Sequence, residues 1–318
     1  MIKKPNELDF SSKTYIVLIA GRPGVGKTTL AMSAPKPLLI DLENGVDRVE
    51  ACYRRDTSVS SSYEEFVRDL KSPEMANYET IVIDTLGALI DMMKPVVIKE
   101  NPVNALKDGK TLSLKGYGAI KTKIKEFFEL CKSLRKHLII LAHVSEFQDG
   151  DVTKTRLNVE GGTKDSIWDF VDLGGFIQFV GKERHIYFSP SEKWDAKGTH
   201  GISGDYEVPT LKPFKEGGKG SDNHFISDLF ATMTNNILSE QESFESGNEA
   251  YEKAMKLAPK VAACATIDEL NAVVEEIKNT KHGLTSKEEL LSKVQKKAKE
   301  LGAVYDKESK GYISAPQD

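Results

Sequence analysis

One glycine-rich segment constrains the fold of this 318-residue chain more than any other part of the sequence. It reads Gly-Arg-Pro-Gly-Val-Gly-Lys-Thr over residues 21–28 and follows an apolar, β-branched run at residues 14–20. The spacing G-x-x-x-x-G-K-[ST], between a strand and a helix, is typical of a loop whose backbone amides surround phosphate groups. The segment therefore predicts a strand, a phosphate-binding loop and a helix, in an α/β fold.

The side chains of this loop predict a site for ATP and Mg²⁺. Lys27 has the length and charge to reach the β- and γ-phosphates, and the hydroxyl of Thr28 is a ligand for the metal. A glycine-rich turn that arose by chance is the alternative, but the strand before it and the helix after it disfavour that reading. The predicted nucleotide-binding set is Gly21, Arg22, Pro23, Gly24, Val25, Gly26, Lys27, Thr28 and Thr29.

Three further apolar runs, at residues 37–42, 80–85 and 137–144, read as buried parallel strands. Ligands of such sheets bind at the edge where the carboxyl ends of the strands meet. Asp84 comes at the end of the second run, so we expect it to hold Mg²⁺ together with Thr28. Asp84 also suits a cap for the following helix, and the two roles are compatible.

Hydrolysis of a phosphoanhydride also needs a group that activates water. Asp84 is followed by Thr85 and not by a glutamate, so this carboxylate must come from another strand. Glu43, just after the run at residues 37–42, is the predicted general base, and Asp41 is its rival; an ordinary exposed loop acid is the alternative for Glu43. His143 is predicted to sense the γ-phosphate through hydrogen bonds, although a satisfied polar residue fits the same position.

The pattern of apolar runs and helical periodicities divides the chain into two regions. Residues 1–238 alternate strands with helices, and the runs at 174–180 and 184–190 read as an antiparallel extension of a mainly parallel sheet. Residues 239–318 show helical spacing and no strand signal, which predicts a small helical region. Its blocks of both charges suit a solvated helix face or a surface that docks a partner.

Composition excludes several classes of protein. The formal net charge of −4 rules out a general polycation, so nucleic-acid binding would require a local basic surface. Three widely spaced cysteines suit a reducing cytosol, and the longest apolar stretch is too short to cross a bilayer. No His/Cys cluster has the spacing of a metal site, and no serine-hydrolase motif occurs.

Taken together, the glycine-rich loop, the strand ending Asp-Leu-Glu, the strand ending Ile-Asp-Thr and the polar end of the next strand resemble the RecA class of P-loop ATPases. The order of elements over residues 14–233 is similar to that of the small phage-encoded members linked to recombination and single-strand annealing. The resemblance implies that Glu43 is the catalytic carboxylate and Asp84 the second acidic motif, with His143 in place of the usual polar sensor.

The same resemblance implies where single-stranded DNA would bind. Two loops hold it in RecA-like recombinases, and they correspond here to residues 99–116 and 145–163. Lysines neutralise phosphates and an aromatic ring stacks on a base, although solvated surface loops fit the same composition. The predicted DNA-binding residues are Lys107, Lys110, Lys115, Phe147, Lys154 and Arg156.

RecA-like enzymes also complete the site from a neighbouring subunit, which implies a homo-oligomeric ring or filament. Lys197, or its alternative Lys193, is predicted to reach the neighbour's γ-phosphate, and two surface lysines in a turn are the alternative. The implied protein is an ATPase that acts in recombination or replication, in the cytoplasm and, if phage-encoded, in that of a host cell. A single-strand binding or annealing protein is the further partner. A nucleoside or small-molecule kinase and a nucleotide-gated interaction module are the rival functions.

Overall fold

The structure is a computed structural model, and it describes residues 2, 7–211 and 222–315. The chain divides into two compact units, one of residues 9–236 and one of residues 1–8 with 237–318. Helix α6 (Phe225–Met255) contributes residues to both units. The predicted domain boundary between residues 238 and 239 falls inside this helix.

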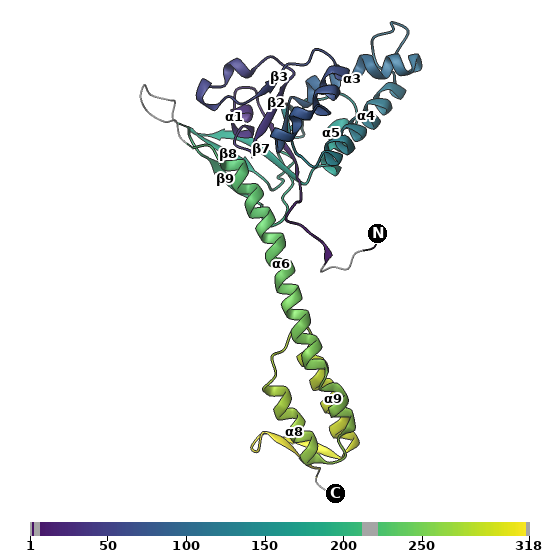
Figure 1. The fold of residues 1–318 in the computed structure, drawn as a ribbon, viewed down its shortest axis with the longest axis vertical. Coiled ribbons are helices and arrows are strands. Elements are labelled where there is room, and N and C mark those ends of the chain that lie inside the picture. The colour runs from purple at the N-terminus through teal and green to yellow at the C-terminus, as the bar shows by residue number, and fades with distance from the viewer. Residues whose placement is uncertain (1, 3–6, 212–221, 316–318) are drawn as a thin grey trace. The chain divides into compact units, whose positions relative to one another are not determined.

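A nine-stranded sheet with the order β3-β2-β4-β5-β1-β7-β8-β9 forms the centre of the larger unit, and β6 pairs with β5 beside it (Figure 1). The strands from β3 to β7 run parallel, whereas β8 and β9 continue the sheet antiparallel. This confirms the predicted α/β class, with a mainly parallel sheet and an antiparallel extension. The strands are β1 (Ile16–Gly21), β2 (Pro37–Asp41), β3 (Thr57–Ser58), β4 (Thr80–Asp84), β5 (His137–Asp149), β6 (Val152–Leu157), β7 (Leu173–Val180), β8 (Glu183–Tyr187) and β9 (Asp205–Val208).

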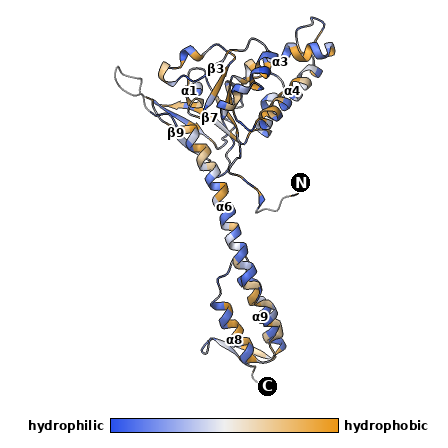
Figure 2. Ribbon diagram, viewed as in Figure 1, coloured by the Kyte–Doolittle hydropathy of each residue, from blue (hydrophilic) through white to orange (hydrophobic). Residues whose placement is uncertain are grey.

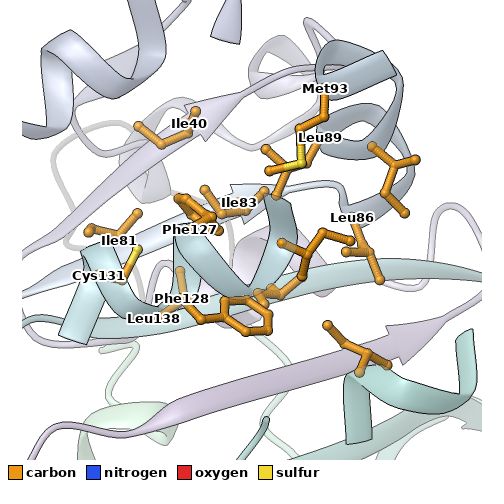
Figure 3. Close-up of a cluster of buried hydrophobic side chains, with 14 of the residues drawn as sticks. Ile40, Ile81, Ile83, Leu86, Leu89, Met93, Phe127, Phe128, Cys131 and Leu138 are labelled. Carbon is orange, nitrogen blue, oxygen red and sulfur yellow. The ribbon is translucent and has the colours of Figure 1, made fainter. Parts of the chain in front are cut away.

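Helices α2, α3 and α4 cover one face of this sheet. All six residues of β1 are buried, because a central parallel strand is covered on both of its faces. Figure 3 shows Phe127 and Phe128 of α4 and Leu89 of α3 packed with isoleucines of the central strands in one core. Bounds on this face are α2 (Tyr63–Leu70), α3 (Leu86–Glu100), α4 (Leu114–Ser133) and the short α5 (Thr163–Ser166).

The opposite face is covered by α1 (Lys27–Ala31) and the first turns of α6. Phe230 of α6 stacks on the ring of His137 at 4.3 Å between centroids and packs on Tyr15 at 5.5 Å. The backbone amide of Ile226 donates a hydrogen bond to the hydroxyl of Ser33, just after α1. These contacts anchor α6 to the larger unit.

The register of the sheet brings the predicted site residues to one edge. Gly21 of β1 lies opposite His143 of β5, and Asp41 of β2 lies opposite Asp84 of β4. β5 separates β1 from β4, so His143 lies between the phosphate loop and the acidic strand ends. Topology alone therefore gathers side chains that are more than a hundred residues apart in the sequence.

Two expectations about local structure were wrong. Residues 145–163 were expected as a loop, but β5 continues to Asp149 and forms a hairpin with β6, in which Val144 pairs with Leu157. Residues 239–318 were expected to lack strands, but β10 (Ala303–Asp306) and β11 (Gly311–Ser314) form a second hairpin. The hairpin strands after Val144 are mostly polar, and β10 and β11 have only four residues each, so neither hairpin gives a long alternating apolar pattern. Hydrogen bonds from Ser309 to Asp306 hold the turn of the second hairpin.

The smaller unit surrounds its own core. Its helices after α6 are α7 (Ala258–Ala263), α8 (Ile267–Lys278) and α9 (Ser286–Glu300), which bury leucines and valines such as Leu270 and Val294 together. Figure 2 shows apolar and polar residues mixed along α8 and α9, as expected for helices with one buried face. Among the described residues no helix combines the length and the apolar character needed to cross a membrane.

Candidate functional site

The loop after β1 has a backbone that only glycine accommodates at its key positions. Gly24 and Gly26 have φ angles of 78° and 90°, in the left-handed region that other residues avoid. A side chain at Gly21 would begin 2.6 Å from the carbonyl oxygen of Ile177 in β7. Gly26 is also the residue before α1, so the loop leads directly into the helix as the motif predicts.

Lys27 lies under this loop with its ammonium group fully engaged. Nζ donates to the carbonyl oxygens of Gly21 and Arg22, both at 3.0 Å, and lies 3.2 Å from Nδ1 of His143. An ammonium group has three protons to donate, so these contacts account for all of them. Burial lowers the pKa of Lys27 to about 8, which leaves a poorly solvated cation that an anion would stabilise.

Thr28 and Asp84 form the second contact of the site. The Thr28 hydroxyl donates to Oδ2 of Asp84 at 2.6 Å. Burial raises the pKa of Asp84, and the hydrogen bond from Thr28 opposes that rise only in part. Mg²⁺ is usually held in nucleotide sites by one or two protein oxygens together with phosphates, and these two oxygens fit that arrangement. Within the described ranges no cluster of three His, Cys, Asp or Glu side chains offers a metal cage.

Glu43 lies at the same edge and is held at both carboxylate oxygens. Oε1 accepts from the hydroxyl of Thr85 at 2.5 Å, and Oε2 lies 3.2 Å from Nε2 of His143. Burial alone would raise the pKa of Glu43, but the hydrogen bonds from Thr85 and His143 outweigh burial and lower it. The carboxylate is therefore ionised at neutral pH, as a general base must be.

His143 connects Glu43 with Lys27 through the two nitrogens of one ring. Because an ammonium group only donates, Nδ1 of His143 accepts from Lys27 and the ring proton of the neutral imidazole lies on Nε2. That proton points to Oε2 of Glu43. The arrangement forms a continuous hydrogen-bonded chain from the phosphate loop to the carboxylate.

Asp41, the alternative base, has a different task. Its two carboxylate oxygens accept from the backbone amides of Gly45 and Val46, at 3.0 and 2.9 Å, and its side chain is buried. These bonds shape the turn that follows β2. The geometry therefore favours Glu43 over Asp41 as the group that faces the loop.

A cavity of about 190 Å³ opens between these side chains. It is smaller than the roughly 300–1,000 Å³ of pockets that bury whole small molecules, so it suits phosphate groups and leaves a base and ribose outside. Its lining gathers the predicted Lys27, Thr28, Glu43, Asp84 and His143 with loop residues Pro23, Gly24, Gly26 and Thr29, and adds Gly45, Arg48 and Val49.

Sequence reasoning missed two arginines near the loop. Arg48 ends the short 3₁₀ turn Val46–Arg48 and lines the cavity, and the described residues offer it no acidic partner. Arg184 of β8 is close enough to Gly26 that a side chain at that glycine would begin 2.5 Å from Nη1. Arg48 lies in an irregular turn that no sequence motif marks, and the approach of Arg184 to the loop depends on the order of the strands.

The lysine predicted to act on a neighbouring subunit is tied to its own chain. Nζ of Lys197 donates to the carbonyl oxygens of Trp168 and Val171, at 3.1 and 2.7 Å. Lys193, the alternative, is exposed and borders a cavity of about 770 Å³ that also includes Arg22 of the phosphate loop. A role for either lysine in a neighbour's site stays a prediction.

The predicted DNA-binding residues fall into two separate groups. Phe147, Lys154 and Arg156 lie on the β5–β6 hairpin, where the Arg156 guanidinium covers the Phe147 ring at 4.8 Å and Lys154 pairs with Asp149 at 2.5 Å. The other group lies between α3 and α4 and is exposed; it comprises Lys107, Lys110 and Lys115. The hairpin also reaches the phosphate loop, through an ion pair between Glu146 and Arg22.

A family model described as an AAA domain matches residues 13–200, which include the whole cavity. No curated protein matches the chain. Among solved structures, a KaiC-like protein from the hyperthermophilic archaeon Pyrococcus horikoshii is similar at 14% identity and a TM-score of 0.35, over 61% of this chain and 89% of that one.

Proposed function

Because this chain belongs to the AAA domain family and is a P-loop ATPase in the general sense, we propose that it is a Mg²⁺-dependent ATPase of the RecA type that acts on single-stranded DNA. The observation that carries the ATPase part of the proposal is the hydrogen-bonded chain from Lys27 through His143 to Glu43. It links the group that would hold the γ-phosphate to the group that would activate water.

In this proposal the nucleotide accepts hydrogen bonds from the Lys27 ammonium, which without nucleotide donates to the loop carbonyls and to His143. A γ-phosphate in the cavity competes with His143 for the ammonium of Lys27. The imidazole then keeps its contact with Glu43 while it loses its contact with Lys27. Binding or loss of the γ-phosphate therefore changes the hydrogen bonding of His143, and through it the surroundings of the Glu43 carboxylate. This is the role expected of a sensor.

Glu43 acts as the general base. Water attacks the γ-phosphorus, the bond to the β–γ bridging oxygen breaks, and the carboxylate takes the proton that the water loses, leaving ADP and phosphate. Thr85 and His143 keep the carboxylate oriented and ionised. Thr28 and Asp84 would hold Mg²⁺, which neutralises charge on the transferring group when it is bound.

Phosphate release with and without single-stranded DNA tests the proposal. We expect Glu43→Gln to lower turnover by about 10²- to 10⁴-fold, the range for loss of a general base, while labelled ATP still binds. Glu50→Gln, an exposed acid in the same segment, is the matched control and should turn over normally. A Glu43→Gln variant with undiminished phosphate release would reject Glu43 as the base, and transfer of phosphate to a nucleoside would favour a kinase.

The DNA part of the proposal is supported by the exposed Arg156 and the half-buried Phe147 ring on the hairpin. Single strands are bound by cations that contact phosphates and by rings that stack on bases. We propose that assembly into a ring or filament places such hairpins along one strand, in recombination or replication of the phage type. Phe147→Ala with Arg156→Ala should weaken binding of an oligothymidine by about tenfold or more, in a gel shift with ATP. If the wild type and the variant shifted the oligothymidine equally, the hairpin would not be part of the DNA site.

A further inference from the structure

The smaller unit contains a second cavity that the ATPase proposal does not use. It has a volume of about 710 Å³ and lies between α8, α9 and the β10–β11 hairpin. Pockets that bind small molecules have volumes of roughly 300–1,000 Å³, so this cavity is large enough to hold a bound segment of another molecule. Its floor is formed by Val274, Val294 and Ala298, which belong to the core of this unit. We call this cavity the lysine groove, after the residues at its rim.

The wall of the lysine groove exposes large apolar side chains. Leu291, Val304 and Tyr305 are 41%, 42% and 51% exposed, and all three line the cavity. Neighbouring apolar side chains that stay in contact with water above a core are typical of a surface that another molecule covers. The aliphatic floor suits a leucine or phenylalanine side chain better than a polar ligand.

The rim of the lysine groove carries charge of one sign. Lys278, Lys287 and Lys299 line it, and the described residues that form the lining include no carboxylate. Lys278 pairs with Glu275 at 3.1 Å, whereas Lys287 and Lys299 make no ion pair with any described residue. This positive rim occurs on a chain of net charge −4, so it is a local feature.

The shape of the groove is held by internal bonds. Nε2 of His282 lies 2.9 Å from the carbonyl oxygen of Ile277, and Nδ1 lies 3.2 Å from the hydroxyl of Ser286. Ser286 is fully buried at the start of α9, and its hydroxyl also accepts from the amide of Gly283. The lysines therefore project from a supported wall, which favours a groove that exists before any partner binds.

We propose that the lysine groove binds a peptide segment of a partner protein that carries aspartates or glutamates beside a large apolar side chain. The apolar side chain fills the cavity, and the carboxylates meet Lys287 and Lys299. Charge complementarity selects the acidic partner and apolar burial supplies the affinity. The proposal is independent of nucleotide hydrolysis, since every residue it uses lies in the smaller unit.

The test is fluorescence anisotropy of the full-length protein with a labelled synthetic peptide of aspartates that flank a leucine and a phenylalanine. We expect saturable binding that is lost when lysines replace the aspartates. The double variant Lys287→Glu with Lys299→Glu should bind about tenfold or more weakly, because like charges then face each other. The matched control is Lys293→Glu with Lys296→Glu, which makes the same change of charge at exposed positions of α9 outside the groove.

Several results would overturn the proposal. If the two double variants weakened peptide binding equally, the effect would come from the overall charge of the protein and not from the groove. Absence of binding, or equal binding of the lysine peptide, would reject an acidic partner. An oligothymidine that displaces the peptide would assign the groove to nucleic acid, and self-association lost only in Lys287→Glu with Lys299→Glu would assign it to a second copy. Equal melting temperatures of all variants would confirm that each one folds.

Discussion

The Nε2 atom of His143 lies 3.2 Å from the Oε2 atom of Glu43, although one hundred residues separate them in the sequence. The other ring nitrogen, Nδ1, accepts a hydrogen bond from Nζ of Lys27 at 3.2 Å. A neutral imidazole can satisfy both contacts at once only with its proton on Nε2. This relationship makes His143 the connection between the phosphate loop and the carboxylate.

Replacement of His143 tests this connection. His143→Ala removes both contacts, and we expect turnover to fall by roughly 10²-fold, similar to the loss of one oriented hydrogen-bond donor at a reacting centre. His143→Gln retains an acceptor and a donor on one planar group, so it should recover part of the activity. Phosphate release measures both variants, and ATP binding by each is the control. Wild-type turnover in His143→Ala would show that the contacts of His143 have no role in hydrolysis.

Thr85 positions Glu43, and its removal should change a pH profile. The Thr85 hydroxyl lowers the pKa of Glu43 through its hydrogen bond, so Thr85→Val should raise that pKa. The base is active when ionised, and therefore the acidic limb of the rate profile should move to higher pH. Thr80→Val is the matched control, because Thr80 is buried as Thr85 is, but lies at the start of β4 and donates to the carbonyl oxygen of Pro35. An unmoved acidic limb in Thr85→Val would contradict this role.

The positions of Glu43 and Asp84 illustrate how much of the site the sequence could predict. Both follow apolar runs that read as parallel strands, and parallel strands present their carboxyl ends at one edge. That rule is enough to expect the two carboxylates near Lys27, and the structure brings them together. The sequence did not predict the hydrogen bond from Thr85 to Glu43. Because position 85 is not a glutamate, however, the sequence did predict that the base comes from another strand.

Features that depend on turns and on irregular segments were beyond the sequence pattern. The β5–β6 hairpin has polar strands, and its pairing is visible only when Val144 is placed opposite Leu157. Arg48 is carried by a turn that the buried Asp41 shapes through backbone bonds. Neither feature has a repeating apolar period, and apolar period is the main signal from which elements are predicted.

We expect Arg48 to offer a cation from the same chain to the transferring phosphate. It lines the cavity of about 190 Å³ beside Lys27 and makes no ion pair with an acid among the described residues. Arg48→Ala should lower kcat by about tenfold or more while ATP binds almost as before, since charge develops mainly in the transition state. Arg55→Ala, an exposed arginine outside the cavity, is the control. An unchanged kcat in Arg48→Ala would leave this charge to another residue, such as a lysine of a neighbouring subunit.

The depressed pKa of Lys27, about 8, predicts that nucleotide binding takes up protons. At a pH near 8 about half of the Lys27 side chains are in the ammonium form when no nucleotide is bound, and the negative charge of the phosphates favours that form. We therefore expect uptake of about half a proton per ATP at that pH, and little uptake near pH 6. Calorimetry in buffers of different ionisation enthalpy measures it. Uptake that is the same in Lys27→Met would assign the proton to another group.

His137 predicts how the stability of the larger unit depends on acid. Its ring is stacked on Phe230, and Nδ1 accepts from the amide of Tyr15 at 3.1 Å. Burial lowers the pKa of His137 from 6.5 to about 4. The unfolded chain therefore binds this proton more readily, and stability that is fully present above pH 6.5 is lost as the pH falls toward 4.

From about pH 7 to about pH 5, this one group should lower the free energy of unfolding by about 2 kcal/mol. Urea unfolding of the wild type and of His137→Gln measures the difference, because the variant has no proton to bind and its stability should decline less over this range. His224 is an exposed histidine of the same unit, and the stability of His224→Gln should decline as much as that of the wild type. Parallel pH dependences for the wild type and His137→Gln would mean that the ring already binds its proton in the folded protein.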